Sequence, residues 1–340
     1  MAARRGDTLL FERMPVIASH AAVGGKKESE GPLAAEFDEL FPDNNCGQAN
    51  WETAEKILQL RAARLCLKKV HATEKQVSLV LAGDLQAQCT ASSYALRELH
   101  LPFVGLFGAC STMAEALGLG AALCSAGLAD GLLAMTSSHF CAAERQFRTP
   151  LSYGAVRTPT AQWTATAAGC CLLHPAGQGV GIAAATFGRV EDYQIKDINN
   201  MGAAMAPAAA ATLLRYLHDT GQEPKDFDAI YTGDLGHLGS RLFREILTAE
   251  GLVMKNHIDC GSILYDAARQ NVKSGGSGPG CCAAVLCGHI LPRLERGSYR
   301  RVLFTATGAL MSQTTFLQKE SIPAIAHLVE LRGPECTARG

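Results

Sequence analysis

The sequence predicts an α/β protein of five layers, α/β/α/β/α, made of two duplicated halves. Short apolar segments of the kind that form buried strands alternate with helical segments, which indicates sheets stacked on helices. The order of these segments also recurs along the chain. An apolar strand that runs into Gly-Asp-Leu occurs at 77–88 and again at 227–238, and such self-similarity is typical of a duplicated unit.

Three further pairs of segments extend the repeat in chain order. The first pair reads as strands, the second as a glycine loop with a cysteine and a helix, and the third as a buried strand that opens into a polar loop. The paired ranges are 15–23 with 180–190, 108–123 with 279–294, and 131–139 with 301–310. Each half is therefore predicted to run strand, helix, strand, helix, strand, strand. We place the two halves at 1–175 and 176–340.

The helices that follow Cys110 and Cys281 are rich in alanine and glycine. A helix of this kind can be covered by protein on all sides, as it is between two sheets. We therefore predict that both helices lie at the centre of the molecule. Two separate doubly wound domains are the alternative arrangement. The segment at 199–210, with two methionines among alanines, is interpreted as a tight loop near the repeat axis.

The composition argues against several classes of protein. The 340 residues carry a net charge of −1 and no polybasic run, which argues against nucleic-acid binding. The thirteen cysteines show no zinc-finger spacing and stand in apolar surroundings, so most are expected to be buried free thiols in a reducing compartment. We expect no signal peptide and no transmembrane segment, and hence a soluble intracellular protein.

Two polar insertions, 24–50 and 139–163, interrupt the pattern of strands and helices. The second insertion contains three arginines, and an arginine-bearing loop on an apolar scaffold is a typical place for function. Arg145 and Arg148 could each hold a carboxylate through two hydrogen bonds. The alternative for Arg145 is an internal ion pair with the adjacent Glu144.

Nine stretches of the sequence resemble one known family. Two long and specific stretches are TSSHFCAAERQFR at 136–148 and ESIPAIAH at 320–327. The others are KKESEGPL (26–33), LAGDLQAQCTAS (81–92), PFVGLFGACSTMAEAL (102–117), NMGAAMAPAAA (200–210), IYTGDLGHLGS (230–240), GGSGPGCCAAV (275–285) and RVLFTATGALMS (301–312). They cover nearly the whole chain in the order of the family. The chain resembles the thiolase superfamily, and within it the stage V sporulation protein AD branch.

The resemblance implies a thiolase-like fold and a protein of spore-forming bacteria that binds dipicolinic acid (pyridine-2,6-dicarboxylic acid). It implies that the protein helps to deliver this acid, with calcium, into the developing spore. It also implies a homodimer that works beside the SpoVA membrane proteins, on the cytoplasmic side or at the periphery of the spore inner membrane. No cofactor is expected to be required, and calcium would arrive as the dipicolinate chelate. The sequence contains no legible calcium cage of its own.

Cys110 raises the question of catalysis. It begins a helix after a glycine loop, and in thiolase-fold enzymes this position lowers the thiol pKa and yields a nucleophile. Such enzymes also need a histidine base and oxyanion donors. By the resemblance, Asp234 stands where the catalytic histidine would be, and Ser277 where asparagine or histidine would be. We therefore interpret Cys110 as a pocket wall and expect no enzymatic activity, while a condensing enzyme that uses Cys110 on an acyl thioester is the rival hypothesis.

A site for dipicolinate must compensate two negative charges, because a buried unpaired carboxylate is costly. The further candidate contacts are Ser137, Ser138, His139, Arg145 and Phe147, with Asp234 and Ser277 beside Cys110. The serines follow a buried strand at its carboxyl end, where α/β sheets bind ligands, although an ordinary turn is the alternative. One carboxylate would meet these serines and the start of the Cys110 helix. The other would meet arginine or calcium, and Phe147 would cover the ring; for Asp234 the alternative is a helix N-cap.

Overall fold

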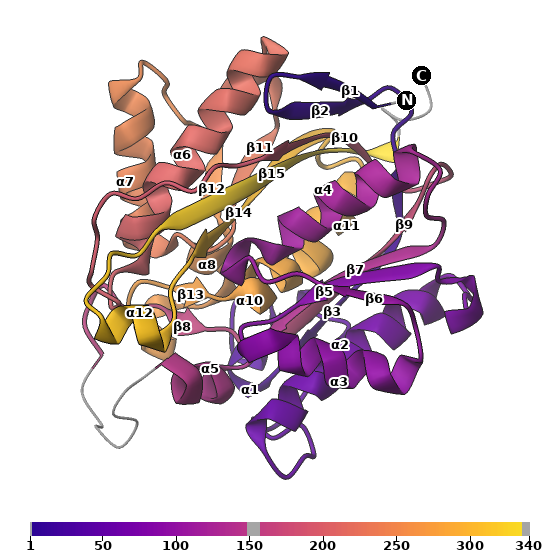
Figure 1. Ribbon diagram of the computed structural model, residues 1–340, viewed down its shortest axis with the longest axis horizontal. Coiled ribbons are helices and arrows are strands. Elements are labelled where there is room, and N and C mark those ends of the chain that lie inside the picture. The colour runs from indigo at the N-terminus through magenta and orange to yellow at the C-terminus, as the bar shows by residue number, and fades with distance from the viewer. Residues whose placement is uncertain (1, 148–156, 335–340) are drawn as a thin grey trace.

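The computed structural model of the protein describes residues 2–147 and 157–334 (Figure 1). Its principal strands form two five-stranded groups. Equivalent strands have the same position and the same direction in both groups. The first group contains, in spatial order, β3 (Val16–Gly24), β9 (Ala167–His174), β7 (Leu132–Ser138), β5 (Leu79–Gly83) and β6 (Phe103–Gly105). The second contains β10 (Val180–Phe187), β15 (Ala324–Arg332), β14 (Arg301–Ala309), β11 (Ala229–Thr232) and β12 (His257–Asp259). In each group the first two neighbouring pairs are antiparallel and the last two are parallel.

The two groups are joined at their facing edges. β3 and β10 pair antiparallel over two residue pairs, Ile17 with Val180 and Val16 with Gly181. The remaining strands are short, namely β1 (Ala2–Arg5), β2 (Thr8–Phe11), β4 (Glu39–Leu40), β8 (Trp163–Thr164) and β13 (Gly276–Ser277). β8 pairs with β13 outside the large sheet and thereby ties a segment of the first half to a segment of the second.

Helices form three layers, one on each outer face and one between the two groups of strands (Figure 1). The outer layer of the first half contains α2 (Trp51–Lys69) and α3 (Thr90–Leu99), and that of the second half contains α6 (Met201–Thr220) and α7 (Gly236–Ala249). The central layer contains α4 (Thr112–Ser125), α10 (Pro279–Val285) and α11 (Leu291–Glu295). The predicted five-layer α/β/α/β/α fold is confirmed.

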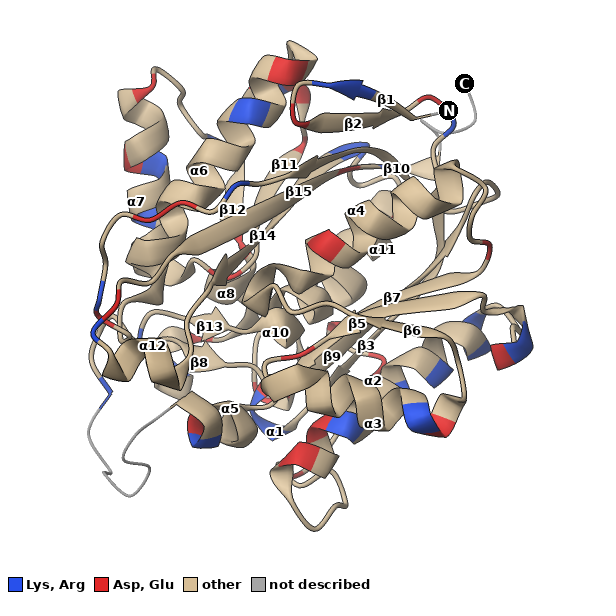
Figure 2. Cartoon of the chain, in the orientation of Figure 1, with Lys and Arg blue, Asp and Glu red and all other residues tan. Residues whose placement is uncertain are grey.

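Three buried apolar clusters match these layers. One fills the space between the two groups of strands around α4 and α10, and the other two lie beneath α2 with α3 and beneath α6 with α7. Charged residues lie mainly on the outer helices and loops, whereas the central helices show few (Figure 2). Cys110 and Cys281 are both buried in the central cluster or beside it, so the helices that they lead lie at the centre, as predicted.

Close contact between layers explains why the central layer is rich in glycine and alanine. A methyl group on Gly120 of α4 would stand 2.9 Å from the side chain of Leu132, and one on Gly169 of β9 would stand 2.5 Å from the carbonyl oxygen of Ala283. Both distances are shorter than van der Waals contact. Because interiors are close-packed, the helices can approach the sheets this closely only where side chains are small or missing.

The other helical segments are short. The α-helices are α1 (Lys26–Ser29), α5 (Phe140–Phe147), α8 (Cys260–Leu264), α9 (Ala267–Gln270) and α12 (Gln313–Leu317), and the 3-10 turns are η1 (Ala34–Glu36), η2 (Glu74–Gln76), η3 (Ala87–Cys89), η4 (Ala109–Ser111) and η5 (Pro224–Asp226). A π-helix, η6 (Leu286–Ile290), separates α10 from α11. Pro292 has no N–H to donate back along an α-helix, which accounts for the widened turn before it.

Two expectations about the elements need correction. Each half contains one helix and one strand more than the predicted order of strand, helix, strand, helix, strand, strand, and the strands that the sequence did not predict are β6 and β12. β6 and β12 are edge strands of three residues each, which is too short to leave a recognisable period in the sequence. The segment at 199–210 is also not a loop, because α6 begins at Met201, where the Asn200 side chain accepts from the N–H of Ala203. Alanine favours helix strongly enough to outweigh Pro207.

The described cysteines are free thiols, and all of them except Cys141 are buried. This confirms the prediction of buried free thiols. Among the described helices, none combines the length and the apolar character needed to cross a bilayer.

Candidate functional site

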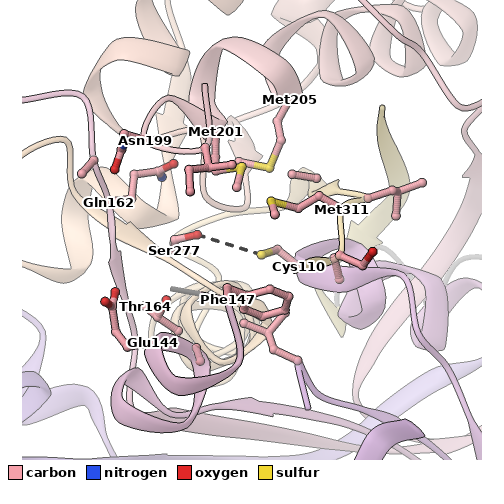
Figure 3. Close-up of a pocket in the computed structure, with 18 of the residues that line it drawn as sticks. Cys110, Glu144, Phe147, Gln162, Thr164, Asn199, Met201, Met205, Ser277 and Met311 are labelled. Atoms are coloured by element: carbon pink, nitrogen blue, oxygen red, sulfur yellow. Dashed lines mark hydrogen bonds between the residues drawn. The ribbon is translucent and has the colours of Figure 1, made fainter. Parts of the chain in front are cut away.

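Cys110 lies in η4, immediately before helix α4, where the two halves meet. Ala109 precedes it with φ of 52°, a left-handed conformation that is costly for a residue other than glycine. This turn leads the chain from the glycine loop into the helix. The Sγ atom of Cys110 consequently faces the second half and lies 4.0 Å from the Oγ of Ser277 (Figure 3).

Asp234 holds this arrangement from the second half. It follows β11 and is fully buried. Its Oδ2 accepts hydrogen bonds from the Oγ of Ser277 and the N–H of Gly278, each at 2.9 Å, and its Oδ1 accepts from the Oγ1 of Thr307 at 2.8 Å. Burial raises the pKa of the Asp234 carboxyl, although these donors and the Cys110 thiol oppose the shift. The thiol therefore faces a serine hydroxyl that a buried acid holds in place.

These surroundings favour the protonated form of the Cys110 thiol. Burial, and after it the neighbouring Asp234 carboxylate, raise the pKa of the thiol well above its usual range. The start of α4 acts in the opposite direction, because a helix N-terminus favours a thiolate, but the raised pKa is the net result. A nucleophilic cysteine needs a lowered pKa or an adjacent base. The described side chains that line the adjoining cavity include no histidine to act as that base.

A cavity of about 580 Å³ opens beside the thiol (Figure 3). This volume is typical of a pocket for a small molecule. Met201, Met205 and Met311 lie on one side of the cavity, and Phe147 of α5 lies on the other. The lining comes from both halves of the chain, so a ligand held there would contact both.

The charged lining residues among those described are Glu144 and Arg157. The Nη1 of Arg157 lies 3.0 Å from the Oε1 of Glu144. Its guanidinium also lies 5.4 Å from the ring centre of Trp163 and 5.5 Å from that of Phe140, and these two rings stack on each other. The Nε of Arg157 is buried without a hydrogen-bond partner in the described part of the chain. The cavity wall thus contains an arginine–glutamate pair, and the Nε of its arginine is buried rather than exposed to the cavity.

Of the predicted contact residues, the structure brings Cys110, Phe147 and Ser277 into the cavity lining, with Asp234 behind Ser277. Ser137 and Ser138 are buried outside this lining at the end of β7. The hydroxyl of Ser137 donates to Glu55 at 2.9 Å, and that of Ser138 donates to the carbonyl of Ala165 at 2.7 Å. These hydroxyls are engaged by the interior of the protein.

His139 is also buried and lies outside the cavity lining. Its Nδ1 accepts from the N–H groups of Cys141 and Ala142, so it serves the first turn of α5. With Nδ1 as an acceptor, Nε2 carries the proton and donates to the carbonyl of Asn44 at 2.7 Å. Burial lowers the pKa of this imidazole, which matches a neutral ring that ties α5 to the insertion at 24–50.

Arg145 forms an ion pair instead of contacting the cavity, which is the alternative that the sequence left open. Its partner is Glu52 of α2 rather than the expected Glu144. Glu144 pairs with Arg157 instead. Arg145 is absent from the cavity lining. Arg148, the other predicted clamp, lies outside the described residues.

Arg157 and Gln162 are lining residues that the sequence reasoning did not select. Both belong to the polar insertion at 139–163, and Arg157 is one of its three arginines. The sequence therefore indicated correctly that this insertion contributes to the cavity, but it did not indicate which of the three arginines lies in the lining. The lining methionines Met201 and Met205 come from the segment that was interpreted as a loop.

Comparison with known proteins decides the family. The sequence model of Stage V sporulation protein AD (SpoVAD) matches residues 5–332. Stage V sporulation protein AD of Bacillus subtilis (strain 168) is 41% identical over 322 residues, which are 94% of this chain and 95% of that protein. The chain belongs to the stage V sporulation protein AD family. It is a sporulation protein with a thiolase-like fold.

Solved structures with the same fold cover almost the whole chain. The 3-oxoacyl-(acyl carrier protein) synthase III, FabH, from Pseudomonas aeruginosa PAO1 matches with a TM-score of 0.58 and 17% identity, over 95% of this chain and 99% of that one. A variant of OleA from Xanthomonas campestris matches with a TM-score of 0.62 and 13% identity, over 95% and 99%. At these identities the likeness shows the fold alone.

Proposed function

We propose that the protein binds dipicolinate, or its calcium chelate, in the cavity beside Cys110 and supports uptake of that ligand into the developing spore. The identity of the ligand in this proposal comes from the family resemblance. The position of the binding site comes from the geometry of the cavity. Binding without catalysis is the proposed role. The protein would work as a homodimer beside the SpoVA membrane proteins, at the spore inner membrane.

The contact of Cys110 with Ser277 is the observation that carries the proposal. A condensing enzyme needs a thiolate and a base next to it. Here the neighbour at 4.0 Å is a hydroxyl that already donates to Asp234, and the pKa of the thiol is raised well above its usual range by burial and by that acid. Both features act against acyl transfer and are compatible with a wall that contacts a ligand.

The cavity supplies what a flat dicarboxylate needs. Phe147 and the methionines Met201 and Met311 offer apolar surface for the faces of a ring. Arg157 is the cation of the described lining and could hold one carboxylate if its guanidinium turned from Glu144 toward the ligand. The start of α4 at Cys110 favours an anion through the helix dipole. Calcium would enter as the chelate, held largely by the ring nitrogen and carboxylates of dipicolinate.

The rival function is acyl transfer through Cys110, and one feature favours it: the cysteine stands at the start of a central helix, as a nucleophile in this fold would. Two measurements separate the functions. Calorimetric titration with dipicolinate, with and without calcium, should show saturable binding, and benzene-1,3-dicarboxylate serves as the matched ligand without the ring nitrogen. Incubation with acetyl-CoA or malonyl-CoA, followed by intact mass, should show no adduct. A stoichiometric adduct that disappears in Cys110→Ser would establish the rival.

A further inference from the structure

Gln162 connects the two loops that form the base of the cavity. It lies in the cavity lining, directly before strand β8. Its Nε2 donates to the backbone carbonyl of Asp234 at 2.6 Å and to that of Gly276 at 2.9 Å. One amide of the first half thus binds both the loop that carries Asp234 and the strand that carries Ser277.

The orientation of this amide is fixed by its partners. Both protons on Nε2 are used, and a flipped amide would place Oε1 against two carbonyl oxygens. The backbone of Gln162 is held as well, because its carbonyl accepts from the Nη2 of Arg157, which is paired with Glu144. A chain of contacts therefore runs from α5 through Arg157 and Gln162 to the base of the cavity.

We propose that Gln162 is a positioning residue of the ligand site, which keeps Asp234 and Ser277 in register beneath Cys110. The backbone bonds between β8 and β13, from Trp163 N to Gly275 O and from Ala165 N to Ser277 O, each at 2.8 Å, fix the strand that carries Ser277. Gln162 adds a bond to the Asp234 loop. Its effect on ligand affinity rests on the proposed function, whereas its effect on Cys110 does not.

The test is Gln162→Met, which keeps the length of the side chain and removes both hydrogen bonds. Site-resolved alkylation of Cys110 by iodoacetamide, followed by peptide mass spectrometry between pH 7 and pH 10, reports on the base of the cavity. We expect alkylation to be about 2- to 10-fold faster at a given pH, in keeping with the loss of a hydrogen bond, because a loosened base admits water and lowers the thiol pKa. Dipicolinate should bind more weakly by a similar factor.

Asn256→Leu is the matched control. The Nδ2 of Asn256 also donates to two backbone carbonyls, those of Pro224 at 3.0 Å and Phe227 at 2.7 Å, and none of these three residues lines the cavity. This variant should alkylate Cys110 at the parental rate. An equal rise in both variants would mean general loosening and would overturn the positioning role.

Gln162→Asn guards against a Met variant that does not fold, as judged by circular dichroism. Its amide is one methylene shorter and cannot span the two loops, so it should show the same faster alkylation. A folded Gln162 variant in which Cys110 is alkylated at the same rate as in the parent, from pH 7 to pH 10, refutes the proposal. If the parent protein itself fails to bind dipicolinate, the proposed function fails, while the alkylation rates still decide the role of Gln162.

Discussion

Arg145 and Glu52 form an ion pair between α5 and α2, with 3.0 Å between the Nη1 of the arginine and the Oε1 of the carboxylate. Half of the Arg145 side chain is exposed, and its guanidinium also covers the ring of Trp51. Exposed ion pairs contribute roughly 0–1 kcal/mol to stability. Arg145 therefore fastens α5 to α2 on the outside, whereas Arg157 lies in the cavity lining.

Arg157→Ala should weaken dipicolinate binding, because it removes the cation of the described lining and leaves the Glu144 carboxylate in the cavity without this partner. A hydrogen bond to a charged group contributes roughly 1.5–3 kcal/mol, so we expect a loss of about tenfold to a hundredfold. Arg145→Ala should leave the affinity within about twofold, because its pair is exposed. Calorimetric titration of both variants, after circular dichroism has shown intact folding, measures the difference. An undiminished affinity in Arg157→Ala would mean that the carboxylate is held elsewhere.

Cys110 should tolerate a small replacement and reject a large one. Cys110→Ser changes the volume little and should bind dipicolinate within about threefold of the parent, because a pocket wall needs no thiol chemistry. Cys110→Leu extends into the cavity and should abolish measurable binding through overpacking. Equilibrium dialysis with both variants gives the comparison. Abolished binding in Cys110→Ser, with the fold intact, would contradict the role of Cys110 as a wall.

Glu55 makes the stability of the protein depend on pH. The carboxyl is buried beside Asp84, and burial together with that acid raises its pKa to about 8. The unfolded chain has the ordinary, lower value, so the stabilisation is fully present at acid pH and is lost as the pH rises through about 8. Glu55→Gln mimics the neutral acid and should reduce this dependence by an amount on the order of a few kcal/mol, while Asp259, whose pKa burial raises to about 7, retains a smaller dependence of its own.

Urea unfolding at a series of pH values from 5 to 9 tests the prediction for Glu55. Glu52→Gln is the control, because Glu52 stands on the same helix in the exposed pair with Arg145. Its unfolding free energy should follow the parent across the range. A parent whose stability does not fall between pH 6 and pH 9 would show that Glu55 does not carry the effect.

Gly280→Ala should destabilise the contact between the two halves. A methyl group there would meet the carbonyl oxygen of Ala167 at 2.2 Å and the Ser138 nitrogen at 2.7 Å. Because both are backbone atoms of β7 and β9, they cannot simply turn away, and we expect a loss of about 3 kcal/mol or more in unfolding free energy. At Gly105→Ala the methyl group would meet the side chains of Phe103 at 3.3 Å and Cys89 at 3.7 Å, and stability should change by less than about 0.5 kcal/mol. Chemical denaturation of both variants makes the comparison.

The sequence was informative about the layers because periodicity and repetition survive in it directly. The family resemblance grouped Asp234 and Ser277 with Cys110, and these three side chains do lie together in the structure. The edge strands β6 and β12 were missed because three residues carry no period. The alanine-rich start of α6 was misinterpreted as a loop, although alanine favours helix.

The ligand contacts were harder to predict because partners distant in sequence decide which polar groups are free. Ser137 is used by Glu55, which precedes it by 82 residues, and His139 is used by Asn44. Nothing local distinguishes a serine that serves the interior from one that faces a ligand. Likewise, Arg145 and Arg157 belong to one insertion, and only the path of the folded loop turns the second toward the cavity.

The shared central layer restricts how any ligand could reach the cavity. Helix α10 of the second half packs against β7 and β9 of the first half, so swinging the halves apart like a shell would uncover the largest apolar cluster. That exposure costs about 25 cal/mol for each Å². A ligand would therefore be expected to enter through small movements of the elements that line the cavity, among them α5 and α12, rather than by separation of the halves. The two halves would then stay fixed relative to each other, and only segments that border the cavity would move.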